Sequence, residues 1–160
     1  TVRRTVIPVQ ELLDAAGKYF KKSMKNRSER IELEIEPMEA KVIGDVNQLR
    51  FLLENLIDEA LTVREDGVIR LQARQDNEYI RFLFTDTRRE KSVEELNQLF
   101  YPNLARMTSG EKGELRGTEY LVCKQIIRDH DEFAGRRGCR INAEPAEGGG
   151  FTVYFTIPRR

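Results

Sequence analysis

The sequence has no tryptophan, one histidine and two cysteines among its 160 residues. Cys123 and Cys139 are too few for a disulfide framework or a zinc cluster, so we expect ordinary buried thiols in a reducing compartment. A single histidine, His130, leaves no partner set from which a Ser/His/Asp or Cys/His nucleophile system could be assembled. These scarcities argue against a disulfide-rich secreted fold and against the common hydrolase sites.

The chain also lacks a net charge and a long apolar run. Its 27 basic and 27 acidic residues balance, which gives no general reason to expect nucleic acid or an anionic membrane as a partner. No apolar stretch approaches the roughly 18 residues of a membrane span, and no secretory signal is recognised. We therefore predict a cytoplasmic fragment without direct membrane insertion, compatible with the cytoplasmic part of a larger membrane-anchored receptor.

What the sequence does contain is enough material for one hydrophobic core. Hydrophobic residues make up 39% and charged residues 34% of the chain, the composition of a soluble globular domain, so residues 1–160 are expected to form a single domain. Apolar residues at helical spacing predict helices after Pro8, after Asp45 and from about Thr118. Residues 1–27 are expected to be an N-terminal helix and linker, with the helix starting almost at once.

Alternating apolar and polar residues predict the strands. "RIELEIEP" is one, "GVIRLQAR" and "EYIRFLFTD" form a hairpin, and "CRINAEP" pairs with "FTVYFTIP" across "GGG". "VIGDVNQL" is expected to be a turn with Asp45 as the helix N-cap, and Ser92 with Glu95 predicts a capping box. Residues 101–116 lack periodicity and are expected to form a lid-like loop.

This order of elements predicts an α+β fold. We expect a two-layer α/β sandwich with helices on one face of a mixed, mostly antiparallel sheet. Its core is expected to bury residues from the central helix, both hairpins and the last helix: Leu49, Leu52, Leu53, Leu56, Ile80, Phe82, Phe84, Val122, Ile126, Val153 and Phe155.

The stretch "LRFLLENLIDEAL" carries a polar flank beside its leucine stripe. Asn55 and Glu59 lie four residues apart, and Asp58 is next to them, so they share one side of the predicted helix. The pattern alone leaves two readings open. The flank is either a solvated helix face or part of a metal and nucleotide site.

The sequences and the order of five segments resemble the ATP-binding domain of sensor histidine kinases, the Bergerat or GHKL fold, over nearly the whole chain. The segments are "VIGDVNQLRFLLENLIDEAL", similar to the N-box; "FLFTD"; "LNQLFYPNLAR", similar to the phenylalanine box; "GTEYLVCKQIIRDH"; and "GGGFTVYFTIP". The resemblance implies a role in two-component signal transduction. It also implies partners among the other domains of a sensor kinase or a partner signalling protein.

The resemblance assigns candidate nucleotide-binding residues by position. Asn55 falls on the first N-box asparagine, Glu59 on the second, which in the family holds magnesium, and Asp86 on the aspartate that accepts a hydrogen bond from the adenine amino group. Arg88 follows that aspartate and offers a charge to a phosphate, and Gly117 survives from the second glycine box. Glu59 is thus the magnesium ligand if ATP is bound, and no catalytic residue is assigned.

The nucleotide boxes are also where the sequence departs from the family. "DTRRE" stands in place of D-x-G-x-G, and Glu119 replaces a glycine near the phosphates. Glycines allow backbone amides to approach a polyanion, and side chains prevent this. We therefore expect a degenerate, pseudokinase-like module with weak or no ATP binding that acts by conformational relay or partner docking. No cofactor is expected with this degenerate site. Mg-ATP is expected only if the site is functional.

Several alternatives stay open. An active histidine kinase with an atypical site would use Glu59 for the metal and Arg88 or Arg89 for phosphate, and an anti-sigma-factor-like serine kinase is a further possibility. Asp86 either retains adenine recognition or pairs with Arg88 or Arg89. His130 is expected to be structural, because it lies at a helix end. The glycines of "EGGGF" are expected to form a hairpin rather than a phosphate loop.

Overall fold

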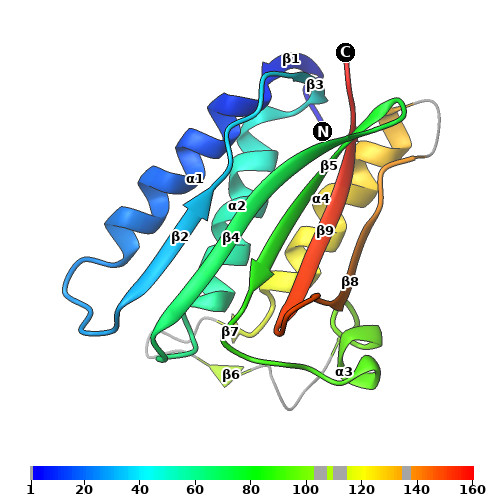
Figure 1. The fold of residues 1–160 in the computed structure, drawn as a ribbon. Helices are drawn as coiled ribbons and strands as arrows, with labels where there is room; N and C mark the ends of the chain where they lie inside the picture. Colours follow the sequence, from blue (N-terminus) through cyan, green and yellow to red (C-terminus); the bar gives the residue numbers. More distant parts are fainter. Residues whose placement is uncertain (1, 103–107, 110–114, 135–137) are drawn as a thin grey trace.

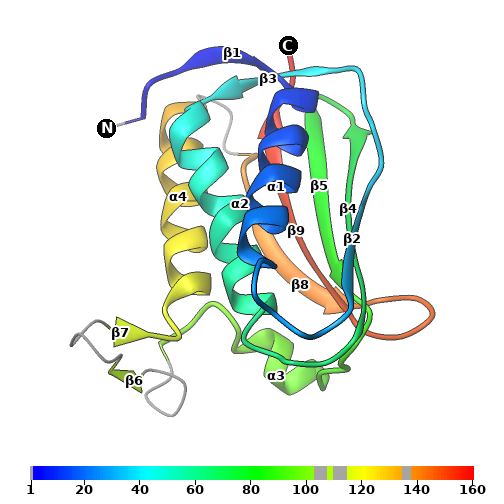
Figure 2. The same ribbon diagram turned by 90° about the vertical axis from the view of Figure 1, so that its left-hand side faces the viewer.

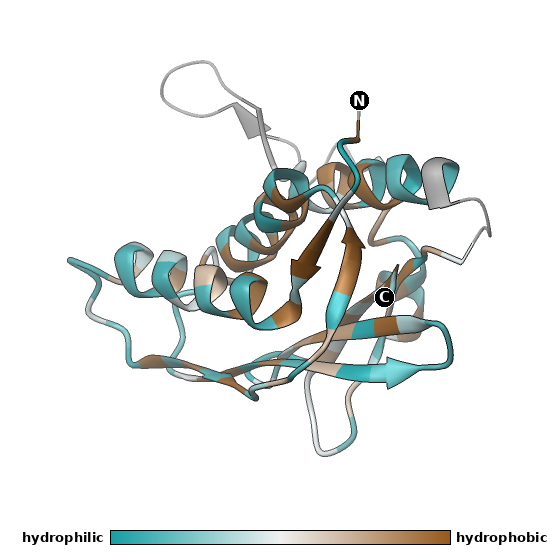
Figure 3. Ribbon diagram, turned by 90° about the horizontal axis from the view of Figure 1, so that it is seen from above, coloured by the Kyte–Doolittle hydropathy of each residue, from teal (hydrophilic) through white to brown (hydrophobic). Residues whose placement is uncertain are grey.

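The protein is a two-layer α+β structure. The computed structural model describes residues 2–102, 108–109, 115–134 and 138–160. Helices α1 (Val9–Ser23), α2 (Val46–Ala60) and α4 (Glu119–Ala134) lie side by side on one face of a five-stranded sheet (Figures 1 and 2). Seen from above, the helices form one layer and the sheet the other (Figure 3). The predicted fold class is confirmed.

The sheet is mixed and mostly antiparallel, as predicted. Its strand order is β2–β4–β5–β9–β8, with the bounds β2 Ile31–Ile35, β4 Gly67–Asp76, β5 Tyr79–Asp86, β9 Phe151–Pro158 and β8 Ile141–Pro145. Only β2 and β4 are parallel, and both predicted hairpins, β4 with β5 and β8 with β9, are present. The glycine-rich connection between β8 and β9 is the expected hairpin loop.

Two short strands were not predicted. Strands β1 (Thr5–Pro8) and β3 (Lys41–Gly44) pair antiparallel, with Ile7 opposite Val42. The expectations of a helix almost at the start and of a turn before Asp45 were therefore wrong in these places. Each strand has four residues, too few to show an alternating pattern, and its partner lies far away in the sequence.

Both predicted helix caps are present. The Asp45 carboxylate accepts hydrogen bonds from the backbone N–H groups of Asn47 and Gln48 at 3.0 and 3.1 Å, which satisfies donors that have no partner inside the helix. Helix α3 (Val93–Asn97) begins with the capping box of Ser92 and Glu95. These local signals explain why α2 and α3 start where the sequence indicated.

The core lies between the helices and the sheet. Phe82 on β5 and Phe155 on β9 stack with ring centroids 4.8 Å apart, and the leucine stripe of α2 packs in the same cluster. Of the core residues predicted from the sequence, all are buried except Val122, which is only half-buried. That prediction was wrong because Val122 lies at the margin of the face that α4 turns toward the core, where Cys123, Ile126 and Ile127 are buried.

The segment predicted as a lid-like loop contains two described strands of two residues, β6 (Thr108–Ser109) and β7 (Leu115–Arg116), which pair antiparallel. Residues 103–107 and 110–114 of that segment lie outside the described residues. None of the helices described here combines the length and apolar character needed to cross a bilayer.

Candidate functional site

The candidate residues gather at one end of the molecule. Strand β5 ends there at Asp86, α2 ends at Ala60 and α4 begins at Glu119, with α3 and the β6–β7 pair beside them (Figures 1 and 2). Three elements that are distant in sequence therefore bring their polar ends together.

Asp86 is held by Arg88 in a buried ion pair. Nε and Nη2 of Arg88 donate to the two carboxylate oxygens at 2.9 Å each, and the backbone N–H of Arg88 donates to Oδ1 at 3.0 Å. The two side chains are only 1% and 6% exposed for arginine and aspartate. Of the two readings left open for Asp86, pairing with Arg88 is the arrangement that the structure contains.

The remaining donors of Arg88 are also occupied. Nη2 donates to the carbonyl oxygen of Ala60 at 2.6 Å, and Nη1 donates to those of Val63 and Glu65 at 3.0 Å each. All five guanidinium N–H groups thus have an acceptor inside the chain. A cation at the C-terminal end of a helix also interacts favourably with the helix dipole. Arg88 therefore ties the end of β5 to the end of α2.

Two glycines give this pair its space. Gly67 has φ +144°, and a Cβ placed there would lie 2.6 Å from Cγ of Arg88. Gly150 has φ +85°, and a Cβ there would collide with the backbone oxygen of Asp86. Sequence reasoning did not connect either glycine with Asp86, because the approach becomes visible only once β4, β5 and β9 are placed side by side.

The polar flank of α2 divides into different environments. Asn55 is buried, and its side-chain amide donates to the carbonyl oxygen of Phe51 at 2.8 Å. Asp58 accepts a hydrogen bond of 2.7 Å from the hydroxyl of Tyr19 on α1. Glu59 is half-buried. Tyr19 was missed by sequence reasoning, since nothing in its surroundings indicated a partner on another helix.

Carboxylates from α2 and α4 lie near one another. Partial burial raises the pKa of Asp58; the hydrogen bond from Tyr19 opposes this shift, and the charge of Glu119 adds to it. Burial raises the pKa of Cys123, with smaller contributions from Glu119 and then Glu59. Oε2 of Glu119 is buried and has no hydrogen-bond partner among the described residues. Negative charge is therefore concentrated at the α2–α4 end.

Gly117 precedes this acidic group with φ +81°, a conformation that suits glycine. Arg89, the other arginine considered, is exposed and pairs with Glu65 at 3.1 Å. Across the described ranges, no group of three or more His, Cys, Asp or Glu side chains could hold a metal ion.

His130 lies far along α4 from these carboxylates and has a structural environment. It is 4% exposed. Its Nε2 accepts a 3.0 Å hydrogen bond from the backbone N–H of Asp45, so the neutral ring carries its proton on Nδ1, which lies 2.8 Å from the carbonyl oxygen of Ile126. Burial lowers the pKa of His130, against the opposing charges of Asp45 and Asp129. Cys123 is likewise a buried thiol.

The family follows from comparison with known proteins. The family model described as "Histidine kinase-, DNA gyrase B-, and HSP90-like ATPase" matches residues 44–160. The chain belongs to this ATPase family. The match covers α2, the β4–β5 hairpin that ends at Asp86 and all of α4. The candidate site described above therefore lies within it. A comparison with curated protein sequences gives no match.

Solved structures of this ATPase family have the same fold. A mycobacterial sensor histidine kinase, MprB, superposes with a TM-score of 0.73 at 20% identity, covering 99% of both chains. The nucleotide-free catalytic domain of histidine kinase ThkA gives 0.73 at 21% identity, covering 98% of this chain and 97% of that one. Full-length ShkA in complex with AMPPNP gives 0.74 at 16% identity; 99% of this chain covers 32% of ShkA.

Proposed function

We propose that this chain is a histidine-kinase-type signalling module whose binding of Mg-ATP is weak or lost, and that it acts by conformational relay or by docking a partner. The observation that carries the proposal is the buried ion pair of Asp86 and Arg88. In the family that this chain resembles, the aspartate at this position reads the adenine amino group. Here both carboxylate oxygens already accept hydrogen bonds from Arg88.

Replacing that pair by adenine is unfavourable. A buried charge that loses its partner costs about 3–5 kcal/mol, whereas a hydrogen bond from a neutral amino group to a charged carboxylate contributes roughly 1.5–3 kcal/mol. Movement of Arg88 would also release the carbonyl oxygens of Ala60, Val63 and Glu65. The same contacts keep Arg88 from serving as a phosphate ligand.

The phosphate side of the site is also a poor fit for Mg-ATP. Carboxylates suit magnesium, but Asp58, Glu59 and Glu119 together bring negative charge toward a triphosphate. The described residues offer no ready metal group. We therefore assign Asn55, Glu59, Asp86, Arg88 and Gly117 to an inherited nucleotide pocket, and we derive no phosphoryl transfer from it.

The partners that fit this role are other domains of a sensor kinase or a separate signalling protein in the cytoplasm. Among the similar structures, ThkA is solved in complex with the response regulator TrrA, which illustrates such an assembly for that protein. We further propose that residues 1–160 act as one domain.

One observation favours the second candidate, an active kinase with an atypical site. The buried Oε2 of Glu119 has no hydrogen-bond partner in the described part of the chain, and a bound cation would satisfy it. Glu59, whose charge acts on Cys123 as that of Glu119 does, would then hold magnesium. This candidate requires ATP to bind without the carboxylate of Asp86, or with Arg88 displaced.

The proposal is tested by restoring the family's residues in steps and titrating each variant with Mg-ATP. Glu59→Asn alone is expected to leave binding weak, because Arg88 still occupies Asp86. Glu59→Asn combined with Arg88→Gly, Glu90→Gly and Glu119→Gly is expected to bind more tightly than any single variant, since residues that share a site act non-additively. Thermal melts must show that each variant is folded. Tight binding by Glu59→Asn alone would contradict the role given to Arg88.

A further inference from the structure

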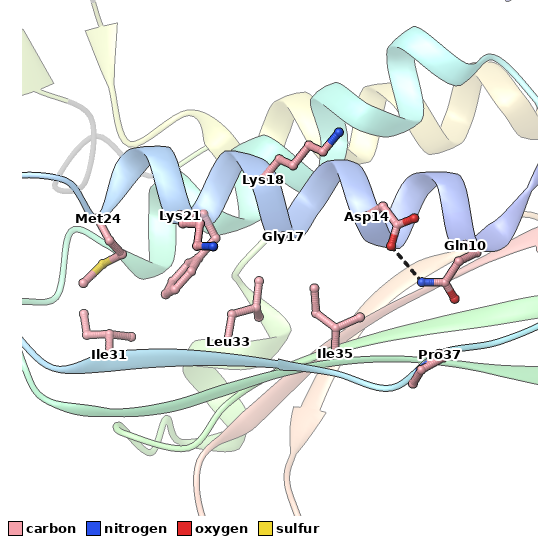
Figure 4. Close-up of a pocket in the computed structure, with 11 residues that line it drawn as sticks. Gln10, Asp14, Gly17, Lys18, Lys21, Met24, Ile31, Leu33, Ile35 and Pro37 are labelled. Atoms are coloured by element: carbon pink, nitrogen blue, oxygen red, sulfur yellow. Dashed lines mark hydrogen bonds between the residues drawn. The ribbon is translucent and has the colours of Figure 1, made fainter.

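A groove lies between α1 and the edge strand β2, away from the nucleotide pocket. It has a volume of about 690 Å³. Ile31, Leu33 and Ile35 of β2 point up toward α1 (Figure 4). Lys21 and the C-cap residue Met24 lie across from them, whereas the side chain of Lys18 extends away from β2. A second hollow of about 820 Å³ shares Gln10 and Pro37 with the groove and continues it past the end of β2.

Gly17 lies on the groove side of α1. A Cβ at this position would lie 3.1 Å from Cδ1 of Ile35. Glycine inside a helix is unfavourable by roughly 0.5–1 kcal/mol relative to alanine. Its presence here lets α1 approach β2 near Ile35 while the groove stays open toward Leu33 and Met24, which are only half-buried.

The free edge of β2 presents unpaired backbone groups beside this groove. Strand β2 bonds to β4 through its even-numbered residues: Gly67 N–H donates to Arg30 O at 3.0 Å, and Glu36 N–H donates to Leu71 O at 3.1 Å. The backbone groups of Ile31, Leu33 and Ile35 therefore point away from β4. No described strand pairs on that side. An extended peptide could add here as a sixth strand.

Charge determines which peptide fits. Glu32, Glu34 and Glu36 are exposed on the outer face of β2, so cross-strand neighbours on that face should be basic. On the helix side, Lys18 and Lys21 border the groove together with one carboxylate, that of Asp14, so the net charge of this side is positive and disfavours basic residues. A shift by one residue exchanges the two faces of a strand, so the two charge patterns together select which face of the peptide meets the groove.

The same pattern argues against a second copy of this chain as the occupant. An antiparallel pair of β2 strands would place the two rows of glutamates opposite each other, and like charges directly across strands are destabilising.

We propose that the β2 edge and the α1–β2 groove bind an extended segment of a partner protein in which aliphatic and basic residues alternate. The aliphatic side chains enter the groove. The basic side chains lie beside Glu32 and beside Glu34, whose exposed carboxylate also pairs with Arg70 of β4 at 3.0 Å. This inference gives the chemistry of a partner for the docking role proposed above, but it does not depend on the loss of ATP binding.

The test uses an acetylated and amidated heptapeptide of alternating lysine and valine, titrated into the isotope-labelled 160-residue chain. Amide shifts are expected at Ile31–Ile35 and along the facing side of α1. A matching peptide of alternating glutamate and valine should bind at least several-fold more weakly. No shifts in β2 at millimolar peptide, or equal binding of both peptides, would overturn the proposal.

Variants of this chain separate the contribution of the glutamate charge on β2 from that of the free backbone edge. Glu32→Lys should weaken the lysine peptide about three- to tenfold, whereas Glu144→Lys, the same change on the opposite edge strand β8, should leave it unchanged. Leu33→Pro removes an edge N–H without removing a bond to β4, and it should abolish binding. If Leu33→Pro does not fold, the comparison of Glu32→Lys with Glu144→Lys decides. Dimerisation through β2 without peptide would also overturn the proposal, in favour of a second copy.

Discussion

The guanidinium of Arg88 donates to both carboxylate oxygens of Asp86 at 2.9 Å while its other donors bind the carbonyl oxygens of Ala60, Val63 and Glu65. The pair therefore joins the end of β5 to the end of α2. The resemblance to the family implies that the aspartate at this position reads adenine. In this chain the aspartate is part of a structural connection, and that difference links the stability of the fold to the proposed loss of nucleotide binding.

The first prediction concerns the stability contributed by this pair. Arg88→Ala leaves the Asp86 carboxylate buried without its partner, so the free energy of unfolding should fall by about 3–5 kcal/mol. Arg89→Ala is the matched control, because Arg89 pairs with Glu65 at the surface and should cost no more than about 1 kcal/mol. Urea unfolding of the two variants measures both values. Equal stabilities would show that the buried pair adds nothing.

The second prediction compares two glycines of the β8–β9 loop. Gly148 and Gly150 both have positive φ, +89° and +85°, but a Cβ at Gly148 meets nothing within 4 Å, whereas one at Gly150 collides with the backbone of Asp86. Gly148→Ala should cost about 1–2 kcal/mol from backbone strain alone, and Gly150→Ala should cost clearly more. Thermal unfolding gives the difference. If the two variants unfold at the same temperature, the loop moves away from Asp86 without a loss of stability.

The third prediction concerns the core. Leu53 is 1% exposed and Phe51, on the same helix, is 51% exposed. Leu53→Ala should lower the free energy of unfolding by about 2–5 kcal/mol, while Phe51→Ala should change it by no more than roughly 0.5 kcal/mol. Urea denaturation distinguishes these outcomes. A large effect at Phe51 would indicate that this side chain is covered in solution.

The fourth prediction is a pH dependence that arises from His130. Burial lowers the pKa of this histidine in the folded protein, so between the folded and unfolded pKa values the unfolded chain binds more protons. Its contribution to stability is therefore complete above the unfolded pKa of about 6.5 and is lost as the pH falls below it. The loss is at most about 1.4 kcal/mol per pH unit.

The matched variant is His130→Gln, which has no proton to gain. Unfolding at about pH 7.5 and pH 5.5 should show a smaller loss of stability in His130→Gln than in the parent chain. The same pH slope in both proteins would show that groups other than His130 cause the dependence.

Local signals explain which parts of the fold could be predicted. The apolar spacing of α1, α2 and α4, the caps at Asp45 and Ser92, and the alternation in β4 and β5 are each contained within a few neighbouring residues. Strands β1 and β3 carry no comparable signal, because Ile7 and Val42 become partners only through tertiary pairing. Val122 was misplaced because helical periodicity assigns a face but does not locate its margin.

The contacts of the candidate site could not be predicted from the sequence. Resemblance assigned Asn55, Glu59 and Asp86 to a pocket, and chemistry named Arg88 or Arg89 as the partner of Asp86. The sequence alone does not decide which arginine pairs with Asp86, because this depends on the carbonyl groups at the end of α2. The hydrogen bond between Tyr19 and Asp58 joins residues 39 positions apart, and no local sequence pattern predicts it.

The most direct test of the central claim is calorimetric titration of the unmodified chain with Mg-ATP. With Asp86 bound to Arg88 and with Asp58, Glu59 and Glu119 near the phosphate side, we predict no binding tighter than about 1 mM, which corresponds to roughly −4 kcal/mol. Micromolar binding of Mg-ATP that is abolished by Glu59→Ala would contradict this account and would establish an active nucleotide site.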